Sequence, residues 1–188
     1  RHSIIQNRVI LNKASHKEIK ERKYTRFEGA FVYQPTPGVY QNIRVFDFRS
    51  LYPSIIIAHN IEPDTLKTTG TEEEKIILAE KAVYFSKKHS FIPQLIRELL
   101  ETRSEIKRKM KNTDKHNQYY KELEAQSYAV KILANASYGY LGFFAARWYN
   151  LNCARAITAM GRKYINQVIE IAEKHNIVLV TSLFEKRG

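Results

Sequence analysis

The sequence predicts an α+β fold, in which a small β-sheet packs with long helices that are inserted between its strands. Three short apolar stretches resemble strands, at residues 27–34, 43–48 and 177–180. Three much longer segments place apolar side chains at helical spacing, namely Ile92–Lys111, Gln118–Ser137 and Ala154–His175.

The first two predicted strands lie near the start of the chain. Residues 1–26 are basic and mixed in character, and we interpret them as a linker from an upstream region. The first residue is not Met, so we expect the chain to be part of a longer one. Alternation in FEGAFVYQ predicts a strand over residues 27–34, PTPGVYQN predicts a turn, and Ile43–Phe48 predicts the next strand.

The remaining elements are mostly helices. A short helix is predicted over Ser50–Asn60, with Pro53 in its first turn, where a missing N–H costs nothing. Another helix is predicted over Glu73–Lys88. The polar turn Asn112–Asn117 joins the first two long helices into a hairpin, the two glycines of SYGYLGFF predict a break, and Asn176 is expected to stop the last helix.

The composition points to a polyanionic partner. The chain has 188 residues, 44% of them apolar, so it can bury a sizeable core. Its formal net charge of +12 favours binding to nucleic acid or to an anionic membrane. No apolar run approaches the ~20 residues that span a membrane, and the N-terminal residues are too polar for a signal peptide, so we expect no membrane partner.

The cysteine and histidine content indicates neither a disulfide framework nor a zinc site. Cys153 is the single cysteine, which rules out an internal disulfide and fits a reducing compartment. It stands at helical spacing with Ile157, so we interpret it as a small buried side chain rather than as a nucleophile.

The predicted hairpin could bring several cationic side chains together in one small volume. Arg103 and Lys107 are one turn apart on the first arm, and Lys131 and Asn135 are one turn apart on the second. Converging cations suit a triphosphate, because each contact to a phosphate oxygen is charge-assisted. The alternative is a solvated charged face, which is weaker for Lys131 because its surroundings, AVKILANASYG, are nearly apolar.

A lone carboxylate in the stretch VFDFRSLYPSII also has two interpretations. Asp47 could hold Mg²⁺, which takes one or two protein carboxylates plus substrate phosphates, or Asp47 or Ser50 could cap the following helix. Tyr52, fixed next to Pro53, could form the floor of a ligand site or belong to the core.

The segment YGYLGFFAARWY is dense in aromatic residues and includes Arg147. Aromatic rings stack on bases or sugars and Arg meets phosphate, although core packing is the simpler interpretation for most of these rings.

These pieces occur together in an order that resembles the family B DNA polymerases, most closely their archaeal replicative branch. VFDFRSLYPSII resembles motif A of that family, and KILANASYG resembles motif B. FEGAF is similar to the Tyr-x-Gly-Gly segment that joins the exonuclease and polymerase halves. LLETRSEIKRKMK resembles the first fingers helix, and ARWY with CARAITAMGR resembles the palm segment after motif B. The resemblance covers nearly all of residues 27–180.

The resemblance implies a small antiparallel palm sheet with packed helices and an inserted two-helix fingers hairpin. Residues 1–26 would be a linker from an upstream region that resembles an exonuclease. The first part of the palm would span residues 27–90 with motif A, and the fingers would span 91–140 with motif B. The second part of the palm would span 141–188 and stop within motif C.

The resemblance also implies a role for individual residues. Asp47, with the backbone of Phe48, would hold two Mg²⁺ ions for the transfer of a nucleotide to a primer 3′-hydroxyl. Tyr52 matches the steric gate that excludes a ribose 2′-hydroxyl. The other implied contacts are with the nucleotide, from Phe48, Ser50, Leu51, Arg103, Lys107, Lys131, Asn135 and Tyr138, and with DNA, from Gly29, Gly139 and Arg147.

The implied partners are primer–template DNA, a deoxynucleoside triphosphate (dNTP) and a sliding clamp. The implied location is the cytoplasm, at the nucleoid of a prokaryote or archaeon.

Two departures from the family pattern are mild. Motif B reads Asn135-Ala136-Ser137-Tyr138 where Asn-Ser is usual, so the hydroxyl is displaced by one position. Phe27 stands where Tyr is common, which removes one hydroxyl contact.

The third departure is the absence of the motif C acids. In the family this motif has the form Tyr-Gly-Asp-Thr-Asp-Ser and should follow IVLV, but this chain continues with TSLF and contains no Asp after Asp114. A two-metal site with one Asp would hold its ions poorly. The chain could be a fragment or split subunit whose partner supplies motif C and the thumb, residues could be missing from the sequence, or the turn could be truly deleted. We favour the first two, because the other substrate-facing positions match.

Three functions follow as competing hypotheses. The first is a palm-and-fingers region of a DNA-directed DNA polymerase that needs a second chain or segment. The second is an inactive polymerase-like module that grips primer–template DNA. The third is a basic helical scaffold with no nucleotide site.

Overall fold

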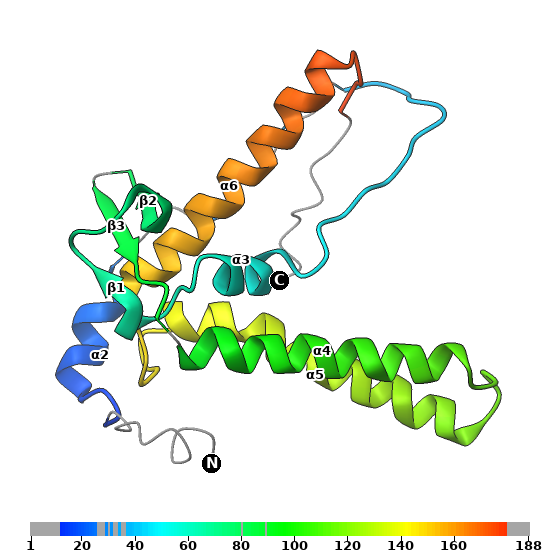
Figure 1. Cartoon of the computed structure of the whole chain (residues 1–188), viewed down its shortest axis with the longest axis horizontal. Helices are drawn as coiled ribbons and strands as arrows, with labels where there is room; N and C mark the ends of the chain where they lie inside the picture. Colours follow the sequence, from blue (N-terminus) through cyan, green and yellow to red (C-terminus); the bar gives the residue numbers. More distant parts are fainter. Residues whose placement is uncertain are drawn as a thin grey trace.

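The computed structural model describes residues 12–25, 29, 31, 34, 37–79, 81–88 and 90–179. It has an α+β fold, as the sequence predicts. Two long arms diverge from a common junction: a hairpin formed by α4 (Phe91–Lys111) and α5 (Gln118–Gly142), and the single helix α6 (Leu151–Lys174) (Figure 1). The short helix α3 (Leu51–Ala58) lies at the junction and contacts all three long helices.

The small sheet is three-stranded and antiparallel, with the order β1-β3-β2. Its strands are β1 (Leu66–Lys67), β2 (Lys75–Ile77) and β3 (Ala82–Phe85), preceded by the 3₁₀ turns η1 (Pro63–Thr65) and η2 (Glu72–Glu74). The predicted helix over residues 73–88 is therefore wrong. Burial alternates along this segment, with Ile76, Leu78, Val83 and Phe85 buried and Ile77 exposed, which is the period of a strand.

The predicted hairpin is confirmed. The first helix ends with Arg108, Lys109 and Lys111 in its last turn, where cations stabilise the negative end of the helix dipole. The second begins at the N-cap Asn117, whose side chain accepts a hydrogen bond from the backbone N–H of Tyr119 at 2.9 Å.

The predicted break at SYGYLGFF does not occur at its start. Helix α5 continues through Gly139 to Gly142 and ends at Phe143, which is extended. A glycine inside a helix costs only about 1 kcal/mol relative to Ala. Leu141, which is completely buried, stabilises the last turn by packing into the core at the junction, and this burial outweighs the cost.

Helix α6 forms where it was predicted, with slightly earlier ends. Its N-cap is Asn150, which accepts a hydrogen bond from the backbone N–H of Cys153 at 3.1 Å. Asn176, which was expected to stop the helix, has a left-handed backbone (φ 54°) just beyond the end. Cys153 is fully buried, and burial, followed by the charge of Glu62, raises the pKa of its thiol, which fits the predicted packing role.

The predicted strands are not those of the observed sheet. Residues 43–48 and 177–179 form no strand, and Ile43, Val45, Phe46 and Val178 are exposed. A strand needs a hydrogen-bonded neighbour, and within the described part of the chain neither segment has one. The predicted strand over residues 27–34 and motif C lie largely or wholly outside the described residues.

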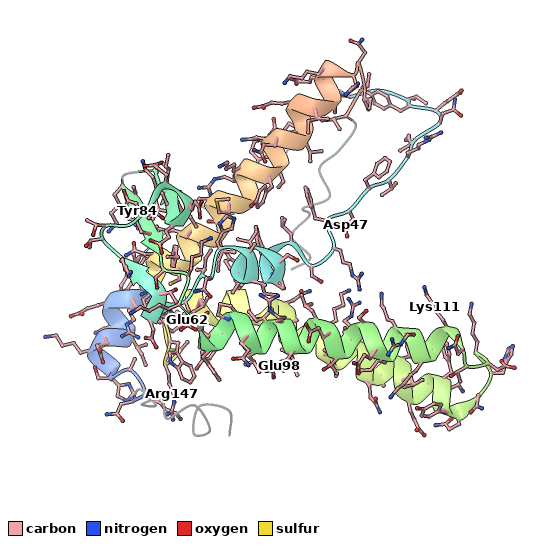
Figure 2. The ribbon with its side chains drawn as sticks, in the orientation of Figure 1. Asp47, Glu62, Tyr84, Glu98, Lys111 and Arg147 are labelled. Atoms are coloured by element: carbon pink, nitrogen blue, oxygen red, sulfur yellow. The ribbon has the colours of Figure 1, made fainter. Side chains whose placement is uncertain are left out.

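The segment after α3 anchors the base of the hairpin. Buried Glu62 accepts a hydrogen bond from the backbone N–H of Ile92 at 2.8 Å, which caps the start of α4 with a carboxylate (Figure 2). The side-chain amide of Asn60 donates to the carbonyls of Ser86 and Lys88, and its oxygen accepts from the Ser90 hydroxyl. The C-terminal end of α3 is thereby tied to the base of the hairpin.

The helix α2 (His16–Lys23) packs beside the loop that connects α5 to α6. It begins with a capping box between Ser15 and Glu18, and its Arg22 lies over the Tyr149 ring at 4.9 Å. None of the described helices combines the length and the apolar composition that crossing a bilayer requires.

Candidate functional site

The start of α3 has an unusual backbone. Ser50, its N-cap residue, lies in the left-handed region (φ 52°, ψ 51°), which costs a residue with a Cβ roughly 1–2 kcal/mol. Neither Asp47 nor Ser50 caps the helix with its side chain, as far as the described residues go, so capping does not explain why these residues are here. Strained residues of this kind cluster at functional sites.

A small pocket opens beside Ser50. Its volume is about 130 Å³, and it is lined by Arg49, Ser50 and Ser54 from the start of α3 and by Leu100 and Arg103 from α4. Arg103, which lines this pocket, has its Nε atom buried without a hydrogen-bond partner among the described residues. A guanidinium beside a pocket can form charge-assisted hydrogen bonds to an anion that enters it.

Further cations surround this pocket. The pKa of Lys107 is lowered, first by the charge of Arg103, then by desolvation, and then by the charges of Arg49, Lys131 and Lys111. The structure therefore brings together the three cations that the sequence predicted to converge, Arg103, Lys107 and Lys131. It adds Arg49, which comes from the segment before α3.

We call Arg49, Arg103, Lys107 and Lys131 the cation cluster. None of the four forms an ion pair with an acid in the part of the chain that the structure describes. Like charges gathered without acids repel one another, so the cluster is poised to bind a polyanion.

Two tyrosines stack next to the cluster. Tyr52 of α3 and Tyr138 of α5 have ring centroids 4.5 Å apart, tilted by 36°. Burial raises the pKa of Tyr52, and burial followed by the influence of Tyr52 raises the pKa of Tyr138 to about 12. Arg162 of α6 opposes both shifts, which places its charge close to the two phenols.

Asp47 and Phe48 precede α3 on an exposed segment. Figure 2 shows Asp47 on the extended chain that enters α3, on the side where α6 and the hairpin diverge. Among the described residues, no three His, Cys, Asp or Glu side chains gather as a metal site. Asp47 can provide one carboxylate ligand for Mg²⁺, but the described residues alone do not form a two-metal site.

The other predicted site residues fall into two groups. Lys131 and Asn135 are exposed on the face of α5 that carries Tyr138, whereas Gly139, also exposed, lines an apolar groove between α5 and α4. Arg147 lies apart: Figure 2 shows it at the base of the hairpin beside α2, on the other side of the molecule from Asp47. The structure thus does not place it with the residues that were predicted to face the nucleotide.

Gly29 connects to the site through α6. It is exposed, and its carbonyl accepts a hydrogen bond from Nη1 of Arg162 at 2.8 Å. The displaced hydroxyl of motif B, on Ser137, bonds the carbonyl of Ala134 in its own helix and faces away from Asn135.

Sequence reasoning missed Arg49 and Arg162. Arg49 had a signal, because it stands between Asp47 and Ser50 in the stretch that was singled out. Arg162 had none, because α6 is distant in sequence and one Arg on a long helix is ordinarily solvated.

Known proteins resemble this arrangement in both sequence and structure. The model of DNA polymerase family B matches residues 2–186. The "DNA polymerase" of Thermococcus gorgonarius is 43% identical over 170 residues, which are 90% of this chain and 22% of that protein. "DNA polymerase 1" of Pyrococcus abyssi is 41% identical over 163 residues, or 87% of this chain and 21% of that protein.

Among solved structures, the family B DNA polymerase from Pyrobaculum calidifontis superposes with a TM-score of 0.73 at 29% identity. The match covers 96% of this chain and 24% of that one. The chain thus spans about a fifth to a quarter of the length of these relatives. A family model that matches nearly the whole chain, together with these relatives, establishes that this protein belongs to DNA polymerase family B.

Proposed function

We propose that this chain is the nucleotide-binding part of a DNA-directed DNA polymerase, which transfers a nucleotide from a dNTP to a primer 3′-hydroxyl on a DNA template. The relatives are DNA polymerases, but the chain covers a minor part of their length, so activity, substrates and partners are inferred for it. Residues 27–90 and 141–188 would form the palm and 91–140 the fingers.

The observation that carries the proposal is the convergence of cations on one pocket: Arg49 and Arg103 line it together with Ser50, and the charges of Arg103, Arg49 and Lys131 act on Lys107. A triphosphate supplies acceptors for these cations and neutralises the repulsion within the cluster. The strained backbone of Ser50 would direct the peptide groups of Ser50 and Leu51 towards the same phosphates.

The chain's other residues would orient the rest of the nucleotide. Tyr52 would lie against the sugar and exclude a 2′-hydroxyl, while Asn135 and Tyr138 would line the nascent base pair. Gly29 and Gly139 would contact DNA, and Arg147, at the base of the hairpin, would meet its backbone at a separate place.

Mg²⁺, when bound, would activate the primer hydroxyl and stabilise the leaving pyrophosphate. Asp47 and the carbonyl of Phe48 would contribute ligands from this chain. The acids of motif C would have to come from another segment or polypeptide, which could also provide the thumb. A sliding clamp would be a partner of the complete enzyme.

The test is binding of dATP to the chain with a primer–template duplex. Arg103→Ala should weaken dATP binding roughly 10- to 100-fold, because it removes a charge-assisted contact worth about 1.5–3 kcal/mol. The matched control is Arg97→Ala, an exposed Arg on another face of the same helix, which should leave the affinity unchanged. Equal affinities for wild type and Arg103→Ala would refute the proposal and favour a scaffold without a nucleotide site.

A second candidate function is a module that binds primer–template DNA without catalysis. The formal net charge of +12 fits such a module. This candidate predicts salt-sensitive DNA binding that does not depend on Asp47, and no primer extension with any added segment. The polymerase proposal predicts extension with Mg²⁺ once a polypeptide carrying the motif C acids is added, and its loss in Asp47→Ala.

A further inference from the structure

Gly161 of α6 lies directly behind the stacked tyrosines. It is buried in the middle of the helix, where glycine is the least favourable residue apart from proline. A Cβ built on it would come 3.2 Å from Cε1 of Tyr52, closer than such contacts usually are. The next atoms, from Ile55 and Leu51, would be at 3.9 Å, which is ordinary contact. The missing Cβ therefore makes room for one ring in particular.

The Tyr52 ring has few ways to respond if that room is filled. Its helix cannot retreat, because Ile55 and Ile56 of α3 are buried in the core of the junction. The Tyr138 ring blocks another side, at a centroid distance of 4.5 Å. The remaining movement is a rotation of the side chain away from α6, which the partial exposure of Tyr52 allows.

We infer that Gly161 is a specificity-determining residue: by lacking a side chain it sets how far the Tyr52 ring projects towards the sugar of a bound nucleotide. This inference rests on the proposed function, in which Tyr52 faces the sugar. Gly161 touches no substrate itself and acts through Tyr52 as a positioning residue. Gly161→Ala pushes the ring outward by a few tenths of an ångström and tightens the exclusion of a 2′-hydroxyl.

The measurement is the ratio of the dissociation constants of ATP and dATP, with the full chain bound to a primer–template duplex. In Gly161→Ala the ratio should rise roughly three- to tenfold, since displacements of about 1 Å can cost a hundredfold in such sites. The melting temperature should not fall, because Ala is favoured over Gly within a helix and its other neighbours are at normal distances. A merely structural role would not change a ratio between two nucleotides that differ by one hydroxyl.

A double-mutant cycle separates this effect from a general change in the site. In the Tyr52→Ala background the ratio should be close to one, and adding Gly161→Ala should leave it there. Asn166→Ala, at an exposed position of the same helix, is the control and should change neither the ratio nor the affinities.

The outcomes also separate this inference from the proposed function. A wild-type chain that binds neither nucleotide refutes the proposed function, and the inference falls with it. A wild-type chain that binds both and prefers dATP, with the same ratio in Gly161→Ala, overturns the inference and leaves the proposed function standing. If Gly161→Ala still raises the ratio in the Tyr52→Ala background, the inference is also overturned, because Gly161 would then act by another route.

Discussion

The two faces of α5 differ sharply in chemistry although they share one backbone. One face carries Lys131, Asn135 and Tyr138 towards the cation cluster. The opposite face carries Leu133 and Tyr140, which line an apolar groove of about 700 Å³ with residues of α4 and with Trp148. The two hydroxyls on that face have partners in the protein: that of Ser137 donates to a carbonyl of its own helix, and that of Tyr140 accepts from the backbone N–H of Arg147 at 3.4 Å. Polar groups that could meet a ligand are thus confined to one face, and the helical repeat alone separates them from the other.

The first test of this comparison removes the packing that holds the C-terminal end of α5, because both faces of the helix depend on it. Leu141 is completely buried at the junction. Leu141→Ala should lower the free energy of unfolding by roughly 2–5 kcal/mol, through lost burial and the cavity left behind. Denaturant unfolding followed by circular dichroism measures this loss.

Leu133→Ala is the matched control on the groove face, where the Leu133 side chain is 59% exposed. It should change the free energy of unfolding by no more than about 0.5 kcal/mol. A similar loss in both variants would mean that the groove, rather than the junction, holds α5 in place.

The parts of the fold that could be predicted from sequence are those set by local pattern. The hairpin follows from helical spacing on both arms and from the polar turn between them, and the C-terminal end of α6 follows from Asn176 just beyond it. The convergence of Arg103, Lys107 and Lys131 needed only the helical repeat and an antiparallel pair.

The parts that could not be predicted depend on distant contacts. The residues of segment 73–88 are compatible with either a helix or a β-hairpin, and the pairing of β3 with β1 favours the hairpin. Helix α5 continues past Gly139 because Leu141 packs against a core built by other elements. The proposed role of Gly161 appears only when α3 and α6 lie side by side, which no local pattern encodes.

The second way to sharpen the comparison is to place the same charge on each face of α5. Lys131→Glu should weaken dATP binding roughly 10- to 100-fold, because it replaces an attraction to the phosphates with a repulsion inside the cation cluster. Leu133→Glu, two residues along and exposed on the other face, should leave dATP affinity unchanged. Titration calorimetry on both variants provides the measurement. Equal losses would show that only net charge matters, and the two faces would then not be functionally distinct.

The smallest expected effect extends the comparison to the two ends of α3. The end opposite Ser50 carries His59, whose Nε2 lies 2.8 Å from the Tyr164 hydroxyl. The pKa of His59 is lowered, first by burial and then by the charges of Lys87 and Lys163. In the unfolded chain the same imidazole should titrate near its ordinary pKa of 6.5.

The sign of the pH effect follows from proton linkage. Below pH 6.5 His59 becomes protonated in the unfolded chain, while in the folded protein, where its pKa is lower, it stays neutral. The free energy of unfolding should therefore decrease as the pH falls from 6.5 towards the pKa of the folded state. His59→Gln should flatten this part of the curve of melting temperature against pH, while His175→Gln, at an exposed position, should not. If the slope survives in His59→Gln, the loss of stability comes from protonated carboxylates instead, and this end of α3 is insensitive to pH in the range where imidazole titrates.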